Sequence, residues 1–199
     1  MPLVPRWALL SSGCAPVVLI CGWTIAARLE GPAYDPATQT ISVLAAYGAA
    51  GFWVMSSALA ALGICHLLTA LGLRAAALPG RVALGAGGVA AFVVALLPPP
   101  SSGGSLRHGA VAAVGFAFLA LWPVLAADRR GAAPWGLRLV PSAAATVLMV
   151  VSAAWFVIEM HNDGAAGAAE RLVTSIQSLW PFVVVASCLR HRYDTGPAR

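Results

Sequence analysis

Six long apolar runs, each almost free of charged residues, constrain this chain more than any other feature. The hydrocarbon core of a bilayer takes roughly 20 apolar residues of helix to cross. Because backbone polar groups in lipid must pair within their own segment, such runs form helices rather than loops. The sequence therefore predicts an all-α fold, a polytopic transmembrane bundle of six helices in one domain over residues 1–199. The expected spans cover about residues 8–27, 50–71, 82–97, 108–126, 139–158 and 172–189.

The composition excludes an ordinary soluble domain. Hydrophobic residues make up 60% of the chain and charged residues 10%, whereas a soluble domain carries about 25% charged residues. Six spans with short loops occupy most of the 199 residues. All twelve cations are arginines, and they are dispersed among the span ends. We therefore expect membrane lipid as a partner and no nucleic acid.

The charged residues divide unequally between the two ends of the predicted spans. One end has nine arginines and two acids, and the other has three arginines and five acids. The positive-inside rule places the arginine-rich end in the cytoplasm, so we expect a plasma-membrane protein with both termini cytoplasmic. The first apolar run exceeds the roughly 7–15 residues of a signal peptide, so we expect it to be an uncleaved span. The nine arginines are Arg6, Arg74, Arg81, Arg129, Arg130, Arg138, Arg190, Arg192 and Arg199.

A polar segment precedes the second span. Asp35 followed by Pro36 is a typical helix start, with an N-cap and a proline at the first position. Thr38, Gln39 and Ser42 then continue one polar face at helical spacing. We expect a short amphipathic helix here, at the outer interface or between the spans.

Polar residues also enter the sixth span. Four of them lie on one face of the predicted helix over about two turns, and they are Glu170, Thr174, Gln177 and Ser178. Polar groups facing lipid are expensive, so this face is expected to turn into the bundle.

Three helix ends and one loop place acids, histidines and arginines in the same outer layer, where we expect a pocket open to the extracytoplasmic side. The alternative is that polar residues simply mark the interface, where they cost little. The candidate catalytic residues are Asp35, His108, Glu159 and Glu170. The candidate substrate-binding residues are Gln39, Ser42, Arg107, Trp155, Arg171, Thr174, Gln177, Ser178 and Trp180.

Two sharper interpretations have weaker support. His108 and His161 with one carboxylate would make an open metal site, but no paired-histidine spacing accompanies them. Ser42 and His108 would suit a serine hydrolase, but the chain lacks a nucleophile-elbow motif. The cofactor therefore stays open.

Several short motifs are spread over nearly all of the chain. They are Tyr34-Asp35-Pro36, Thr40-Ile41-Ser42 followed by Trp53, Pro98 followed by His108, Gly167-Ala168-Ala169-Glu170-Arg171, and Trp180-Pro181. In these motifs the chain resembles DUF998, a bacterial family of unknown function with six-helix membrane proteins. The resemblance brings no assigned reaction. It implies functional importance for five residues, namely Asp35, Ser42, His108, Glu170 and Arg171.

Three classes of function fit these patterns. The first is a membrane enzyme of hydrolase or cyclase type that acts on a lipid or isoprenoid substrate by acid–base chemistry. The second is a non-catalytic membrane subunit or assembly factor, which needs no reactive site. The third is a small transporter, although the inner halves of the spans are almost free of charge and show no path across.

Overall fold

The computed structural model describes residues 4–101, 104–128 and 133–194, with side chains to residue 191. Among these residues it has seven α-helices, one 3-10 turn and no named strand, which confirms the all-α class. Six of the helices are long and apolar enough to cross a membrane, so the predicted number of spans is confirmed. The elements are α1 (Arg6–Glu30), α2 (Ile41–Leu44), α3 (Phe52–Gly72), α4 (Leu78–Leu96), α5 (Leu106–Ala126), η1 (Trp135–Leu137), α6 (Leu139–His161) and α7 (Ala166–Asp194).

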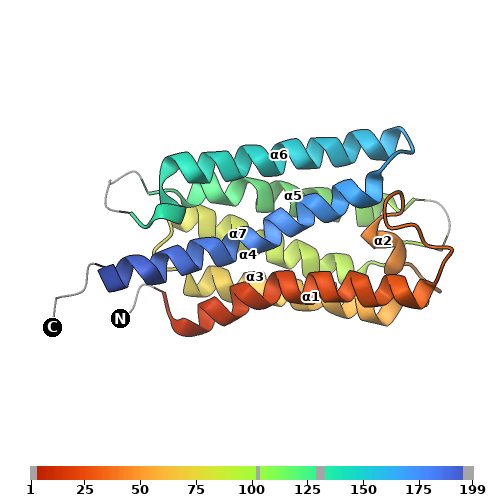
Figure 1. The fold of residues 1–199 in the computed structure, drawn as a ribbon, viewed down its shortest axis with the longest axis horizontal. Coiled ribbons are helices and arrows are strands. Elements are labelled where there is room, and N and C mark those ends of the chain that lie inside the picture. The colour runs from red at the N-terminus through yellow and green to blue at the C-terminus, as the bar shows by residue number, and fades with distance from the viewer. Residues whose placement is uncertain (1–3, 102–103, 129–132, 195–199) are drawn as a thin grey trace.

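The six long helices lie side by side along the long axis of the molecule (Figure 1). Their contacts form a closed ring in the order α1, α3, α4, α5, α6, α7 and back to α1. α6 buries the smallest share of its apolar stretch. α1 begins and α7 ends at the same end of the bundle, here named the terminal end, and α2 lies at the opposite end, named the α2 end (Figure 1).

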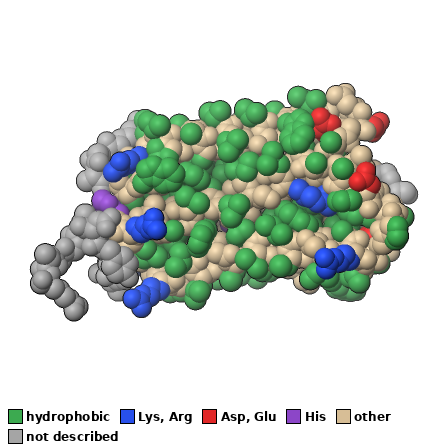
Figure 2. Space-filling view, in the orientation of Figure 1, with side chains coloured by type: hydrophobic (Ala, Val, Ile, Leu, Met, Phe, Trp, Pro, Cys, Tyr) green, Lys and Arg blue, Asp and Glu red, His purple; other side chains and the backbone are tan. Residues whose placement is uncertain are grey.

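Charge follows these two ends. In the face shown in Figure 2, Asp and Glu side chains gather at the α2 end, and hydrophobic side chains cover the length of the bundle. Arginine side chains appear near both ends of this face. Part of the predicted arginine bias lies outside the described side chains, namely at Arg129, Arg130, Arg192 and Arg199.

The short helix before the second span is present, but it begins later than the sequence pattern predicts. Residues 35–39 form a turn instead, in which the Asp35 carboxylate accepts hydrogen bonds from Ala37 N (3.0 Å) and Thr38 Oγ1 (2.8 Å). The bond from the Ala37 N–H lowers the pKa of the Asp35 carboxyl below its usual value. Such local side-chain bonds compete with helix formation. Only Ile41–Leu44 is helical.

The sixth long helix starts earlier than predicted, at Ala166 rather than near residue 172. Its first turn packs directly on the turn before α2, because Ala168 N donates to Ala37 O at 2.9 Å. A Cβ atom at Gly167 would lie 2.2 Å from Gln39 O, so only glycine allows this approach. The charged Glu170 and Arg171, which set the predicted boundary, lie inside the helix because the neighbouring segment satisfies them.

α3 and α4 approach each other through glycine. A Cβ atom at Gly63 would lie 2.6 Å from Gly88 O, and one at Gly88 would lie 2.8 Å from Gly63 O. Small residues at such contacts let membrane helices associate without a hydrophobic driving force. Gly63 and Gly88 therefore allow the close approach of α3 and α4.

Replacing Gly63 by alanine should lower the thermal stability of the purified protein. The new methyl group would overlap backbone atoms of α4, and overpacking of this kind costs about 1–3 kcal/mol. Alanine recovers only about 1 kcal/mol through helix propensity. Gly109→Ala is the matched control, since no atom lies within 4 Å of its added methyl group. Thermal unfolding in one fixed detergent compares the two, and equal responses would contradict the close contact.

Candidate functional site

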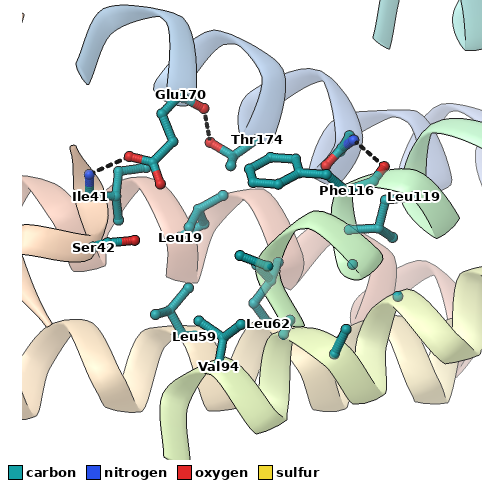
Figure 3. A pocket seen from close by; sticks show the side chains of 16 residues that line it. Leu19, Ile41, Ser42, Leu59, Leu62, Val94, Phe116, Leu119, Glu170 and Thr174 are labelled. Carbon is teal, nitrogen blue, oxygen red and sulfur yellow. Dashed lines mark hydrogen bonds between the residues drawn. The ribbon is translucent and has the colours of Figure 1, made fainter. Parts of the chain in front are cut away.

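A half-open cavity of about 80 Å³ lies between the helices, and residues of α2 line one end of it (Figure 3). α1, α2, α3, α4, α5 and α7 line it, mostly with apolar side chains. Ordinary small-molecule sites have volumes of about 300–1,000 Å³, so this cavity is small by comparison. Its polar lining consists of Ser42, Glu170, Thr174 and Gln177.

Glu170 is the buried carboxyl group of this cavity, with a side chain 6% exposed. One carboxyl oxygen accepts a hydrogen bond from the backbone N–H of Ile41, the first residue of α2 (Figure 3). Helical spacing brings Thr174 and Gln177 from the same face of α7 into the cavity. The Gln177 amide also donates to Phe116 O at 3.1 Å, so its side chain bridges α7 and α5.

His108 lies at the start of α5 and is 6% exposed. Its Nδ1 is 2.8 Å from Leu97 O, and its Nε2 is 3.0 Å from Ser42 Oγ. A carbonyl oxygen only accepts, so Nδ1 carries the proton of that bond. In the neutral ring Nε2 is then an acceptor, and the Ser42 hydroxyl donates to it. The Leu97 carbonyl thus holds one ring nitrogen while the other contacts the Ser42 hydroxyl. Serine nucleophiles that are paired with a histidine base share this arrangement.

The two contacts meet at consecutive residues of α2. Glu170 holds the backbone of Ile41, and His108 holds the side chain of Ser42. The structure therefore brings His108, Ser42 and Glu170 to one end of the cavity, from three elements far apart in sequence.

Arg171 has a different role from the expected substrate contact. Its Nη1 donates to three backbone carbonyls, those of Pro36 (2.8 Å), Gln39 (3.2 Å) and Gly167 (2.9 Å). Its Nη2 donates to the Tyr34 hydroxyl at 2.6 Å. Burial raises the pKa of the Tyr34 phenol. The guanidinium is thus occupied in tying the turn before α2 to α7.

The other expected site residues lie away from the cavity. Glu159 accepts from Trp155 Nε1 (2.9 Å) and from Ala165 N (2.6 Å), so it closes the loop between α6 and α7. Asp35 and Gln39 bond within the exposed turn. The remaining four do not line the cavity. Arg107 and His161 are exposed, the buried Ser178 hydroxyl donates to Ser175 O, and Trp180 packs against Trp135.

A metal centre at His108 and His161 gains no support from the geometry. Within the described ranges, no group of three or more His, Cys, Asp or Glu side chains is placed to hold an ion. His161 is exposed, and its Nδ1 is 2.9 Å from Val157 O of its own helix.

Sequence reasoning missed the carbonyl of Leu97 and the phenol of Tyr34. A signal for the first was present, because helix ends leave backbone carbonyls unpaired and three prolines follow Leu97 without an N–H to offer. Tyr34 was expected only as part of a family motif.

Together these features define a polytopic helical membrane protein whose bundle contains a largely apolar cavity with a polar cluster at one end. A family model described as "Protein of unknown function (DUF998)" matches residues 13–187, a range that includes every residue lining the cavity. The chain belongs to this family. No curated protein and no solved structure matches it.

Arg171→Gln should loosen the turn before α2, because glutamine cannot replace donors to four acceptors on that segment and its own helix. Hydrogen exchange of residues 34–41 should rise at least several-fold, while exchange in α4 stays the same. Arg107→Gln, which removes an exposed arginine at the same end, is the control. Unchanged exchange of residues 34–41 in Arg171→Gln would refute the anchoring role.

Proposed function

We propose that this chain is a membrane enzyme of hydrolase type, which acts on a lipid or isoprenoid substrate by acid–base chemistry at Ser42, His108 and Glu170. The observation that carries the proposal is the hydrogen bond from Ser42 to His108 Nε2, at 3.0 Å, beside an apolar cavity.

The chemistry follows from the roles that the contacts allow. His108 takes the Ser42 proton as the hydroxyl oxygen attacks a carbonyl carbon, and the Leu97 carbonyl keeps the ring oriented throughout. An ester carbon–oxygen bond then breaks, and the leaving alkoxide takes the proton that His108 received from Ser42, while the Glu170 carboxyl holds the Ile41 N–H beside the serine. Water, activated by His108, releases the acyl group from Ser42 and restores the enzyme.

The cavity favours an apolar substrate. Leu19, Leu59, Leu62 and Val94 surround the space below the polar cluster (Figure 3). A hydrocarbon or prenyl end in the membrane has no hydrophobic drive into such a site, so van der Waals contacts with these side chains would hold it there. A lipid reaches the bundle by diffusion in the membrane plane, so the substrate needs no aqueous route.

The proposal includes an orientation. The chain lies in the plasma membrane with its terminal end in the cytoplasm, so that the polar cluster opens to the extracytoplasmic side. The arginine-rich loops of the terminal end support this orientation.

A second candidate function is a non-catalytic membrane subunit or assembly factor. Two hydrogen bonds to the backbone favour it. Glu170 accepts from Ile41 N at the start of α2, and Arg171 donates to Gln39 O in the turn before α2. In that case the polar cluster holds the bundle together and performs no reaction.

An alkyl fluorophosphonate tests the enzyme directly, because this probe labels serines activated by a neighbouring base. Ser42 should be labelled in the wild-type protein in vesicles. Labelling should vanish in Ser42→Ala and fall by about 100-fold or more in His108→Gln, the usual range for loss of a general base. Ser178→Ala, at a buried serine outside the cavity, is the matched control and should label normally.

The same variants separate the two candidate functions. Vesicles of the native lipid extract should lose one lipid class over time with wild-type protein and not with Glu170→Gln. A folded wild-type protein that is unlabelled at Ser42 and consumes no lipid would overturn the enzyme and leave the subunit. Labelling that persists in His108→Gln would overturn the proposed base.

The orientation has its own test in a variant whose native cysteines are replaced. Arg74→Cys adds a thiol at the terminal end, and Ser101→Cys adds one at the α2 end. A membrane-impermeant maleimide should label the second in intact cells and the first only after the membrane is opened. The reverse pattern would show that the polar cluster faces the cytoplasm.

A further inference from the structure

Besides the Ser56 hydroxyl, three side chains in the described part of the chain have polar atoms without a protein partner, two of them buried and the third, Trp180, half-buried. Both ring nitrogens of His66 and the indole nitrogens of Trp122 and Trp180 are unpaired among the described residues. The side chains of His66 and Trp122 are 0% exposed. Buried polar groups in native proteins are almost always satisfied by protein, water or ligand, so three such groups together call for a physical cause.

The helix spacing places the three side chains about one turn past residues that line the cavity. Leu62 of α3, Leu119 of α5 and Gln177 of α7 line the cavity, and all three helices run from the α2 end towards the terminal end. His66 follows its lining residue by four positions, and Trp122 and Trp180 follow theirs by three. Such spacing keeps the same helix face and descends about one turn.

Two neighbouring glycines of α4 show where His66 lies relative to the cavity. Gly87 lines the cavity, and a Cβ atom there would lie 2.6 Å from the Leu119 side chain. A Cβ atom on the next residue, Gly88, would lie 3.0 Å from His66 Cβ. α4 therefore contacts the cavity wall on one side and His66 on the other, within two consecutive residues.

The donor and acceptor set defines the ligand that fits. Each indole offers one N–H donor, and a neutral imidazole offers one donor and one acceptor. A ligand that satisfies them needs oxygen lone pairs and, for one bond, a hydroxyl hydrogen. An ion would enter this layer of hydrocarbon only at high cost.

We infer that His66, Trp122 and Trp180 form a second polar site at the foot of the cavity, which binds an uncharged oxygen group. The group is a hydroxyl of an organic molecule, or bound water. The site is separate from the Ser42–His108 pair and stands whether or not the proposed reaction does.

The sign of a stability difference tests the inference. His66→Leu removes every hydrogen bond to the bound oxygen, whereas His66→Gln keeps a donor and an acceptor. With the site occupied, the melting temperature of His66→Leu should fall below that of His66→Gln by about 3 °C or more. With no ligand the order reverses, because leucine buries no polar group and glutamine does. His161→Leu and His161→Gln, at an exposed histidine, form the control pair and should melt alike.

The combined effect of two substitutions on stability provides a second test of a shared ligand. If one ligand joins the groups, the combined loss in His66→Leu with Trp122→Phe should be smaller than the sum of the single losses. Additive losses, or a His66→Leu protein as stable as His66→Gln, would overturn the shared site. Wild-type protein is then extracted and analysed by mass spectrometry beside His66→Leu. A compound present at about one per chain only in the wild type identifies an organic ligand, and its absence identifies water.

Discussion

Every polar group that enters the bilayer must find its partner inside the protein, and this requirement governs how the bundle is closed. The long helices satisfy their own backbones, but side chains such as Ser11, Thr69 and Gln177 need partners across helices. Ser11 and Thr69 bond each other at 2.9 Å between α1 and α3, and Gln177 bonds the backbone of α5. Glu170 and Arg171 at the start of α7 carry charge, so they are the most costly to leave without partners. Both hydrogen-bond the chain at or before α2.

This solution makes the α2 end a structural closure and also the place where the polar side chains Ser42, His108 and Glu170 meet. Glu170 and Arg171 are adjacent in sequence, yet one turns into the cavity and the other towards Tyr34 and the backbone of the turn. The turn presents Ile41 and Ser42 to the bundle, and there Ser42 meets His108. A change that frees the turn therefore also alters the contact between Ser42 and His108.

The sequence predicted what depends on apolar length and helical period. The six spans follow from hydropathy, and the cavity face of α7 follows from the spacing of Glu170, Thr174 and Gln177. The sequence could not predict which polar side chains at the α2 end would be satisfied by hydrogen bonds to nearby residues of the chain. Glu159 reaches the N–H of Ala165 and Asp35 the N–H of Ala37, both within a few residues, and only loop geometry reveals such bonds. Trp180 follows Gln177 by about one turn of α7, and there its ring packs against the ring of Trp135 rather than against the cavity.

The cavity itself is the feature that packing alone does not explain. Protein interiors are close-packed, whereas here the helices leave a half-open space of about 80 Å³ between them. The space exists because α4 and α5 present small residues to it, including Gly87, Ala90 and Gly115, where one larger side chain would fill it. Small residues around this space and polar side chains at one end of it together favour a site for an occupant over a defect of packing.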